Sequence, residues 1–123
     1  MKKTAGVKEL TFQFALNVIS ITTTIKQEEK EFVITKQLLK SGTAIGALVR
    51  EAEFAQSRAD FINKMSIALK EANETIYWLE LLTMSFIKYK HKCEELIITA
   101  TSLLRILVTI VKKAKENLSQ KKL

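Results

Sequence analysis

Proline is absent from this 123-residue chain, and turn-forming and reactive residues are scarce: there are three glycines, one cysteine and one histidine. All-β domains need turn residues at intervals of about 8–12 residues, so this composition argues against a β fold. The single cysteine, Cys93, excludes an internal disulfide and indicates a reducing compartment. The longest apolar run, residues 96–111, contains Arg105 and falls short of the ~20 residues that span a membrane. We therefore expect a cytoplasmic protein built from long helices.

The same scarcity argues against catalytic and metal sites. A di-iron site in a four-helix bundle needs a Glu-x-x-His pair on each of two helices, whereas the residue three before His91 is Lys88. A zinc site needs a cluster of Cys and His ligands, which His91 and Cys93 alone cannot complete. Glu71 and Glu74 are neighbours on a predicted helix, but paired surface carboxylates more often face water or a cation than catalyse. The sequence thus predicts no catalytic residue, no cofactor and no metal, and hence a protein that is not an enzyme.

Apolar residues recur at spacings of three and four along four segments, which is the pattern of a helix with one buried face. We predict helices over residues 7–26, 31–54, 58–86 and 93–118. The stripe of the first helix consists of Val7, Leu10, Phe14, Val18, Ile21 and Ile25. The threonines at positions 22–24 are poor helix formers and predict a fraying end, while Ser57 and Asp60 form a capping pattern where the third helix begins. Short connections favour a single domain, residues 1–123, folded as an all-α antiparallel up-down-up-down four-helix bundle.

Two of the three glycines, Gly42 and Gly46, lie inside the second predicted helix and four residues apart, so they share one face. Glycine inside a helix costs about 1 kcal/mol relative to alanine. We expect close approach of a neighbouring helix as the compensation, because no Cβ stands in its way. The alternative is a break into two helices at Gly42.

Positive charge is unevenly distributed along the chain. The net charge is +7, and residues 86–123 carry nine Lys and Arg against three Glu, a net of +6. Such clusters attract nucleic acid or another acidic partner, and the contact is electrostatic and weakly selective for sequence. The alternative is that these lysines offset a helix dipole and keep the protein soluble. The candidate contacts are Lys88, Lys90, Lys92, Lys112, Lys113, Lys115, Lys121 and Lys122.

The third and fourth predicted helices carry more apolar surface than one buried stripe requires. An additional apolar flank is typical of contact with another subunit. Alternatively, the aromatic residues of the third helix cover the edge of the core. The candidate oligomer-interface residues are Tyr77, Trp78, Leu81, Ile98 and Ile106.

Three segments in the middle of the chain resemble a known family. They are residues 41–52 (SGTAIGALVREA), 55–64 (AQSxxDFIxK) and 67–82 (IALKEANETxYWLELL). They resemble the bacterial four-helix bundle proteins, also called the 23S rRNA intervening-sequence protein family. The resemblance implies a small up-down bundle, often a homopentamer, without catalytic residues to carry over. The fold is also similar to the basic pentameric accessory protein of diversity-generating retroelements, which partners a reverse transcriptase and nucleic acid.

Two functions remain after these exclusions. The first is a non-enzymatic oligomeric scaffold that binds RNA or DNA through its basic surface. The second is a protein–protein interaction module that binds no nucleic acid and whose positive charge serves solubility. Charge favours the first, and the broad apolar faces of two helices favour the second.

Overall fold

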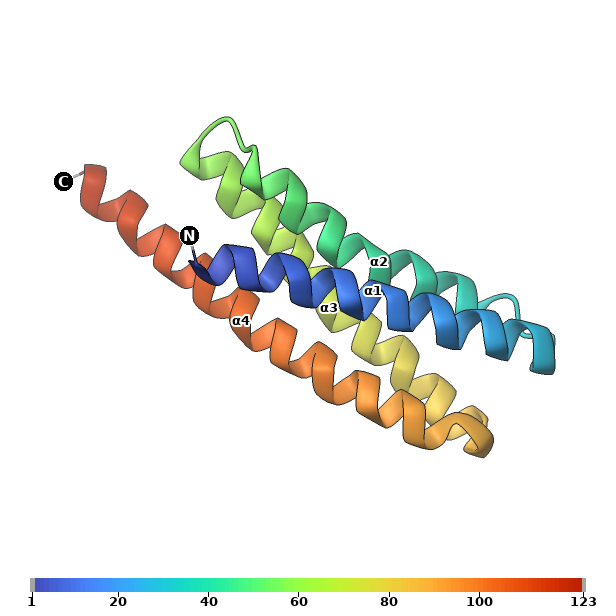
Figure 1. Cartoon of the computed structure of the whole chain (residues 1–123). Helices are drawn as coiled ribbons and strands as arrows, with labels where there is room; N and C mark the ends of the chain where they lie inside the picture. The colour runs from blue at the N-terminus through green and yellow to red at the C-terminus, as the bar shows by residue number, and fades with distance from the viewer. Residues whose placement is uncertain (1, 123) are drawn as a thin grey trace.

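Four long helices follow one another along the chain and pack side by side in a computed structural model of the protein (Figure 1). The structure describes residues 2–122, and the side chains of residues 6–119. The helices are α1 (Lys2–Glu29), α2 (Ile34–Glu53), α3 (Arg58–Ser85) and α4 (Lys90–Lys122), with a short 3-10 helix, η1 (Ile87–Tyr89), before α4. Successive helices run in opposite directions, so the predicted all-α up-down-up-down bundle is confirmed.

The helices are held together by the apolar stripes that the sequence predicts. Their largest fully buried side chains are Phe14, Ile25, Leu38, Ile45, Met65, Leu79, Leu82, Leu103 and Leu107. Burial of a side chain of this size stabilises the fold by roughly 1.5–3 kcal/mol. Packing is not equal around the bundle. α1 packs much more extensively on α2 than on α4, whereas α2 and α4 both pack closely on α3. We call this loosely packed boundary between α1 and α4 the seam.

The seam explains one wrong assignment. Leu10 is predicted in the core stripe of α1, but 49% of its side chain is exposed. Leu10 lies on the α4 side of α1, where a groove lined by Val7, Leu10 and Ile106 separates the two helices. The helical spacing is right, but the partner helix does not approach closely enough to cover this position.

The connection between α1 and α2 also differs from the prediction. Instead of fraying, α1 continues through the three threonines to Glu29, and each threonine hydroxyl donates to the carbonyl four residues earlier. Lys30 then adopts a left-handed backbone with a φ of 55°, which ends the helix. The carboxylate of Glu31 accepts hydrogen bonds from the backbone N–H groups of Ile34 (2.8 Å) and Thr35 (2.9 Å), and so caps α2. Partial burial of Glu31 acts to raise its pKa, but these hydrogen bonds outweigh burial and hold the pKa below its usual value.

Two local predictions on α2 and α3 are confirmed. At the start of α3, the Ser57 hydroxyl accepts from the backbone N–H of Asp60 at 3.0 Å, and the Asp60 carboxylate accepts from the backbone N–H of Gln56 at 3.2 Å. α2 is one uninterrupted helix, so the alternative break at Gly42 is wrong. The two glycines let α1 approach closely: a Cβ on Gly42 would lie 2.9 Å from both γ-carbons of Val18. A Cβ on Gly46 would lie 3.3 Å from the Thr11 hydroxyl.

The remaining helix boundary concerns α4, which begins at Lys90 rather than Cys93 and continues to Lys122. Its last turns extend beyond the start of α1 (Figure 1). No helix within the described part of the chain is long and apolar enough to cross a membrane.

Candidate nucleic-acid and oligomer interfaces

The predicted basic contacts fall into two clusters at opposite ends of α4. The N-terminal cluster comprises Lys88, Lys90 and Lys92, and the C-terminal cluster comprises Lys112, Lys113 and Lys115. Lys90 and Lys112 are 22 residues apart on one helix, which at 1.5 Å per residue is about 33 Å. The side chains of Lys121 and Lys122 lie outside the described residues. The structure therefore separates the candidate contacts into two sites rather than one patch.

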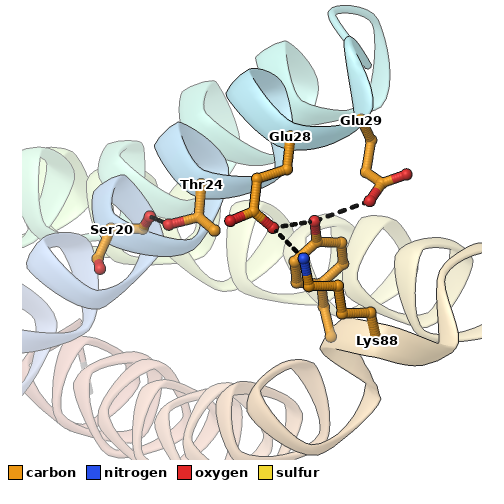
Figure 2. A network of polar contacts seen from close by, with 6 residues as sticks. Ser20, Thr24, Glu28, Glu29 and Lys88 are labelled. Carbon is orange, nitrogen blue, oxygen red and sulfur yellow. Dashed lines mark hydrogen bonds and ion pairs between the residues drawn. The ribbon is translucent and has the colours of Figure 1, made fainter.

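The N-terminal cluster is partly engaged within the molecule (Figure 2). Lys88 Nζ donates to Glu28 Oε1 at 2.7 Å, and the Tyr89 hydroxyl lies 2.6 Å from the same oxygen and 2.9 Å from Glu29 Oε2. The hydrogen bond from Lys88, followed by that from Tyr89, lowers the pKa of Glu28, and the same carboxylate raises the pKa of Lys88. This network ties the connection between α3 and α4 to the last turn of α1. Part of the charge of Lys88 is therefore already balanced before any partner binds.

Burial of the Tyr89 ring sets the character of this network. Only 4% of the Tyr89 residue is exposed, and its ring meets that of Phe86 edge to face. Burial raises the pKa of Tyr89 well above its ordinary value, and hydrogen bonds to Glu28 and Glu29 raise it further. The phenol therefore stays protonated throughout the physiological pH range, and the two carboxylates share its single O–H as acceptors.

The C-terminal cluster differs in its surroundings. Lys112, Lys113 and Lys115 are exposed, and none of them pairs with a carboxylate among the described side chains. Because these three lysines lie within four consecutive residues and only one carboxylate, Glu116, follows in the same turn, this part of α4 presents a concentrated net positive charge.

The five candidate interface residues lie on two helices, α3 and α4. Tyr77, Trp78 and Leu81 lie on α3, where the Tyr77 and Trp78 rings meet edge to face with their centroids 5.0 Å apart. Trp78 is half-buried against the core and donates from Nε1 to Glu74 at 3.1 Å, whereas Tyr77 is 54% exposed. Trp78 thus covers the edge of the core, in agreement with the alternative interpretation of the aromatic residues of this helix.

The other two candidates lie on α4 and face different neighbours. Ile98 is 68% exposed, whereas Ile106 is half-buried and lines the groove along the seam with Val7 and Leu10. Of the two α4 candidates, Ile98 is thus accessible to another molecule, whereas Ile106 belongs to the seam.

A further apolar surface lies between α1 and α2, and its residues were not among the candidate interface residues predicted from the sequence. Phe12, Leu16 and Ile19 of α1 are each 44–54% exposed, and Leu39 of α2 lies beside them at 38%. The spacing of 12, 16 and 19 marks one helical face, so a signal was present in the sequence. It could not be assigned to a surface without knowing which flank of α1 its neighbours leave open.

The histidine and the cysteine do not form a catalytic pair. His91 is exposed and its Nε2 lies 3.7 Å from Glu95 Oε1. Cys93 is fully buried, and this burial raises the pKa of its thiol, which disfavours the nucleophilic thiolate. Within residues 6–119, no three His, Cys, Asp or Glu side chains are grouped so that they could hold a metal ion.

The decisive comparison is with a protein-family model. Residues 3–109 match the model of the 23S rRNA-intervening sequence protein. The chain belongs to this family. The match includes all of α2 and α3 and most of α1 and α4, and it ends before the C-terminal basic cluster.

A crystal structure from the same group supports the membership. It is that of a protein with unknown function from the S23 ribosomal protein family of Bacteroides thetaiotaomicron VPI-5482. The two chains are 48% identical and superpose with a TM-score of 0.85, over 89% of this chain and 98% of that one. No curated protein matches this family member. The comparisons therefore establish the family and the fold of this chain, and they assign it no function.

Proposed function

We propose that this member of the 23S rRNA-intervening sequence family is a non-enzymatic, cytoplasmic helical scaffold that binds RNA or DNA through the basic ends of α4. The observation that carries the proposal is the concentration of charge: residues 86–123 have a net charge of +6 out of +7 for the chain. Exposed lysines near a polyanion displace condensed counterions, and that release of ions supplies most of the affinity of non-specific binding.

The C-terminal cluster is the stronger half of the proposed site. Lys112, Lys113 and Lys115 are exposed and free of ion pairs with the described carboxylates, whereas Lys88 is already bound to Glu28. The last turns of α4 also extend past the body of the bundle, so a long polyanion can approach them from several directions (Figure 1). Binding there needs no cavity and no base-specific contact, which fits an electrostatic and weakly selective interaction.

We further propose that the protein acts as a homo-oligomer, and the family resemblance makes a pentamer the expected stoichiometry. Exposed apolar side chains in contiguous sets support self-association, in particular Phe12, Leu16 and Ile19 on α1. An oligomer would also repeat the basic ends of α4 several times in one particle. Repetition raises the effective affinity for a long polyanion without any additional contact within one subunit.

A gel-shift titration with mixed-sequence RNA and DNA at several salt concentrations tests nucleic-acid binding. The logarithm of the affinity should fall linearly with the logarithm of the salt concentration. The double substitution Lys112→Gln and Lys115→Gln should make that slope shallower by about 2 for duplex DNA, at about 0.9 per lost phosphate contact. The control with equal charge loss is Lys40→Gln with Lys70→Gln, two exposed lysines on α2 and α3, which should leave the slope nearly unchanged. Absence of binding at low salt, or binding indifferent to salt, would rule out this function.

The alternative is a protein–protein interaction module with no nucleic-acid binding. The observation that favours it is the apolar surface between α1 and α2. Non-specific binding of a nucleic acid depends on cationic side chains and does not require such an apolar surface. In that case assembly should persist while all gel-shift experiments stay negative, and the lysines of α4 would serve only solubility.

A further inference from the structure

The apolar surface between α1 and α2 is a continuous groove. Its floor is made of small residues, among them Ala15 and Gly46, and its walls carry Phe12, Leu16 and Leu39. The half of the groove nearer the start of α1 has a volume of about 340 Å³, and the other half has about 260 Å³. Ile19 lines both halves, so they form one trough along the two helices. A trough of this kind receives side chains that project from a ridge on another helix.

Charge along this groove has one sign. Four cationic residues line it, Lys8, Lys26, Lys36 and Arg50, and no carboxylate lines it. Lys8 is bound to Glu53 at 3.1 Å, and Arg50 lies over the Phe12 ring at 5.7 Å from its centroid. Lys26, Lys36 and Arg50 form no ion pair with the described carboxylates. The surface that fits the groove should therefore be apolar in the middle and acidic at its sides.

One surface of this same chain has that character. Tyr77, Leu81 and Met84 recur at spacings of four and three on the outward side of α3, and 54% of Tyr77 and 84% of Met84 are exposed. We call these three residues the α3 ridge. Glu74 and Glu80 are exposed on either side of it, and residues 71–87 contain three Glu and no Lys or Arg. The C-terminal half of α3 thus combines exposed apolar side chains with acidic ones and carries no Lys or Arg.

The two surfaces also agree in length. The groove residues Phe12, Leu16 and Ile19 have the spacing i, i+4, i+7, and so do the three ridge residues. Each stripe therefore extends over seven residue-to-residue steps, or about 10 Å of helix. α3 packs on α2 and α4 but not closely on α1, so the ridge and the groove face different sides of the bundle. One subunit can then use both surfaces at the same time.

From this complementarity we propose that the groove between α1 and α2 of one subunit receives the α3 ridge of a second copy of the chain, in a head-to-tail contact. The inference rests on the homo-oligomer proposed above and names its interface. Pairing of two grooves face to face would bring Lys26, Lys36 and Arg50 against their own counterparts, which like-charge repulsion disfavours. A head-to-tail contact uses two different surfaces and generates a closed ring when the rotation between subunits closes, or a filament when it does not.

The proposal is tested with two variants that each damage one surface. Ala47 is exposed and lines the groove, so Ala47→Trp fills the groove without entering the core. Glu80→Lys with Met84→Lys reverses the charge on one side of the ridge and removes the most exposed apolar side chain of the ridge itself. The control is Phe54→Lys, which matches the Met84→Lys exchange in charge, at a position that is also 84% exposed but lies outside both surfaces. Mass is measured by light scattering after size-exclusion chromatography, and folding is checked by circular dichroism.

We expect the wild type and the Phe54→Lys control to have the same oligomeric mass, and each surface variant alone to be a folded monomer of 14.0 kDa. An equal mixture of the two surface variants should form a dimer of about 28 kDa, twice the chain mass of 14.0 kDa, because one intact groove and one intact ridge remain. The mixture should stop at the dimer, since each end then carries a damaged surface.

Four results would overturn the proposal, and they have different consequences. If the wild type is a monomer at micromolar concentration, both this interface and the homo-oligomer are wrong. If the surface variants keep the wild-type mass, the oligomer stands and its interface lies elsewhere. If the variants are folded monomers that form no dimer when mixed, the contact is not head to tail. Binding of the wild-type groove only to an acidic helix of another protein, with no self-association, would equally contradict it.

Discussion

The close contact between α1 and α2 at Gly42 makes a quantitative prediction about stability. Replacing glycine by alanine inside a helix ordinarily gains about 1 kcal/mol. At Gly42 the new Cβ would lie 2.9 Å from both Cγ1 and Cγ2 of Val18, a distance that carbon atoms do not tolerate. Valine is branched at Cβ and has one strongly preferred rotamer in a helix, so it cannot turn both γ-carbons away.

The relief must therefore come from a shift of one helix against the other. Overpacking of this kind costs about 1–3 kcal/mol. After subtraction of the gain in helix propensity, Gly42→Ala should lower the free energy of unfolding by about 0–2 kcal/mol. For a chain of this length, 1 kcal/mol corresponds to roughly 3–5 °C in Tm.

The sign of the effect should depend on Val18. In a Val18→Ala background both γ-carbons are absent and only the Cβ of residue 18, at 3.3 Å, stays close, so Gly42→Ala should stabilise by up to about 1 kcal/mol through helix propensity. The assay is urea denaturation followed by helical circular dichroism, at one fixed protein concentration because assembly couples to stability. Stabilisation of the wild-type background by Gly42→Ala, equal to that in the Val18→Ala background, would refute the argument from close packing. The coupling between the two substitutions is the quantity to report.

Two further predictions concern the ends of helices. Ser57→Ala removes the hydroxyl that accepts from a backbone N–H at 3.0 Å, and should destabilise the protein by about 1 kcal/mol in the same urea assay, whereas Ser119→Ala on the exposed last part of α4 should have little effect. Hydrogen bonds from Lys88 and Tyr89 lower the pKa of Glu28 in the folded state, so its charged form contributes stability above its unfolded pKa, and this contribution is lost as the pH falls through the lower folded value. The stability difference between wild type and Glu28→Gln should thus be constant from pH 8 to about 5.5 and shrink below about pH 4.5; a difference that persists undiminished at pH 3 would contradict the proposed origin.

The sequence was sufficient for the fold because each helix carries a stripe whose period is unambiguous. Phe14, Leu38, Leu79 and Leu107 all lie where a 3.6-residue period places them, and they are buried. The role of Gly42 and Gly46 in letting α1 approach α2 closely was also predictable. Two glycines on one helical face lower helix stability, and close packing of a neighbouring helix is the main way to offset that cost. Helix ends were less predictable. Lys30 ends α1 by adopting a left-handed backbone. The sequence does not predict this conformation, because residues other than glycine rarely have a positive φ.

The candidate sites were only partly predictable, for a different reason. A count of charges does not reveal that Lys88 is already bound to Glu28, sixty residues earlier in the chain. It also does not reveal that the two basic clusters are about 33 Å apart along α4. Likewise Phe12 and Phe14 have equal hydrophobicity, but only the arrangement of the helices decides that Phe14 is buried and Phe12 is 54% exposed. Surfaces depend on which helices are neighbours, and periodicity in one helix carries no information about that.

Grooves lie along the seam between α1 and α4 near both of its ends, but among the described side chains hydrogen bonds close only one end. Tyr89, Glu28 and Glu29 bind the last turn of α1 to the connection before α4, while a groove lies between Val7 and Ile106 near the opposite end. Local opening of the bundle should therefore begin at the start of α1 and spread toward the end that Tyr89 holds by hydrogen bonds. Amide protons near Val7 would then exchange with solvent well before those near Ile25, although both side chains are equally buried. The two halves of α1 thus differ in local stability: the half that ends at Glu29 is held to η1 by hydrogen bonds, and the half near Val7 opens first.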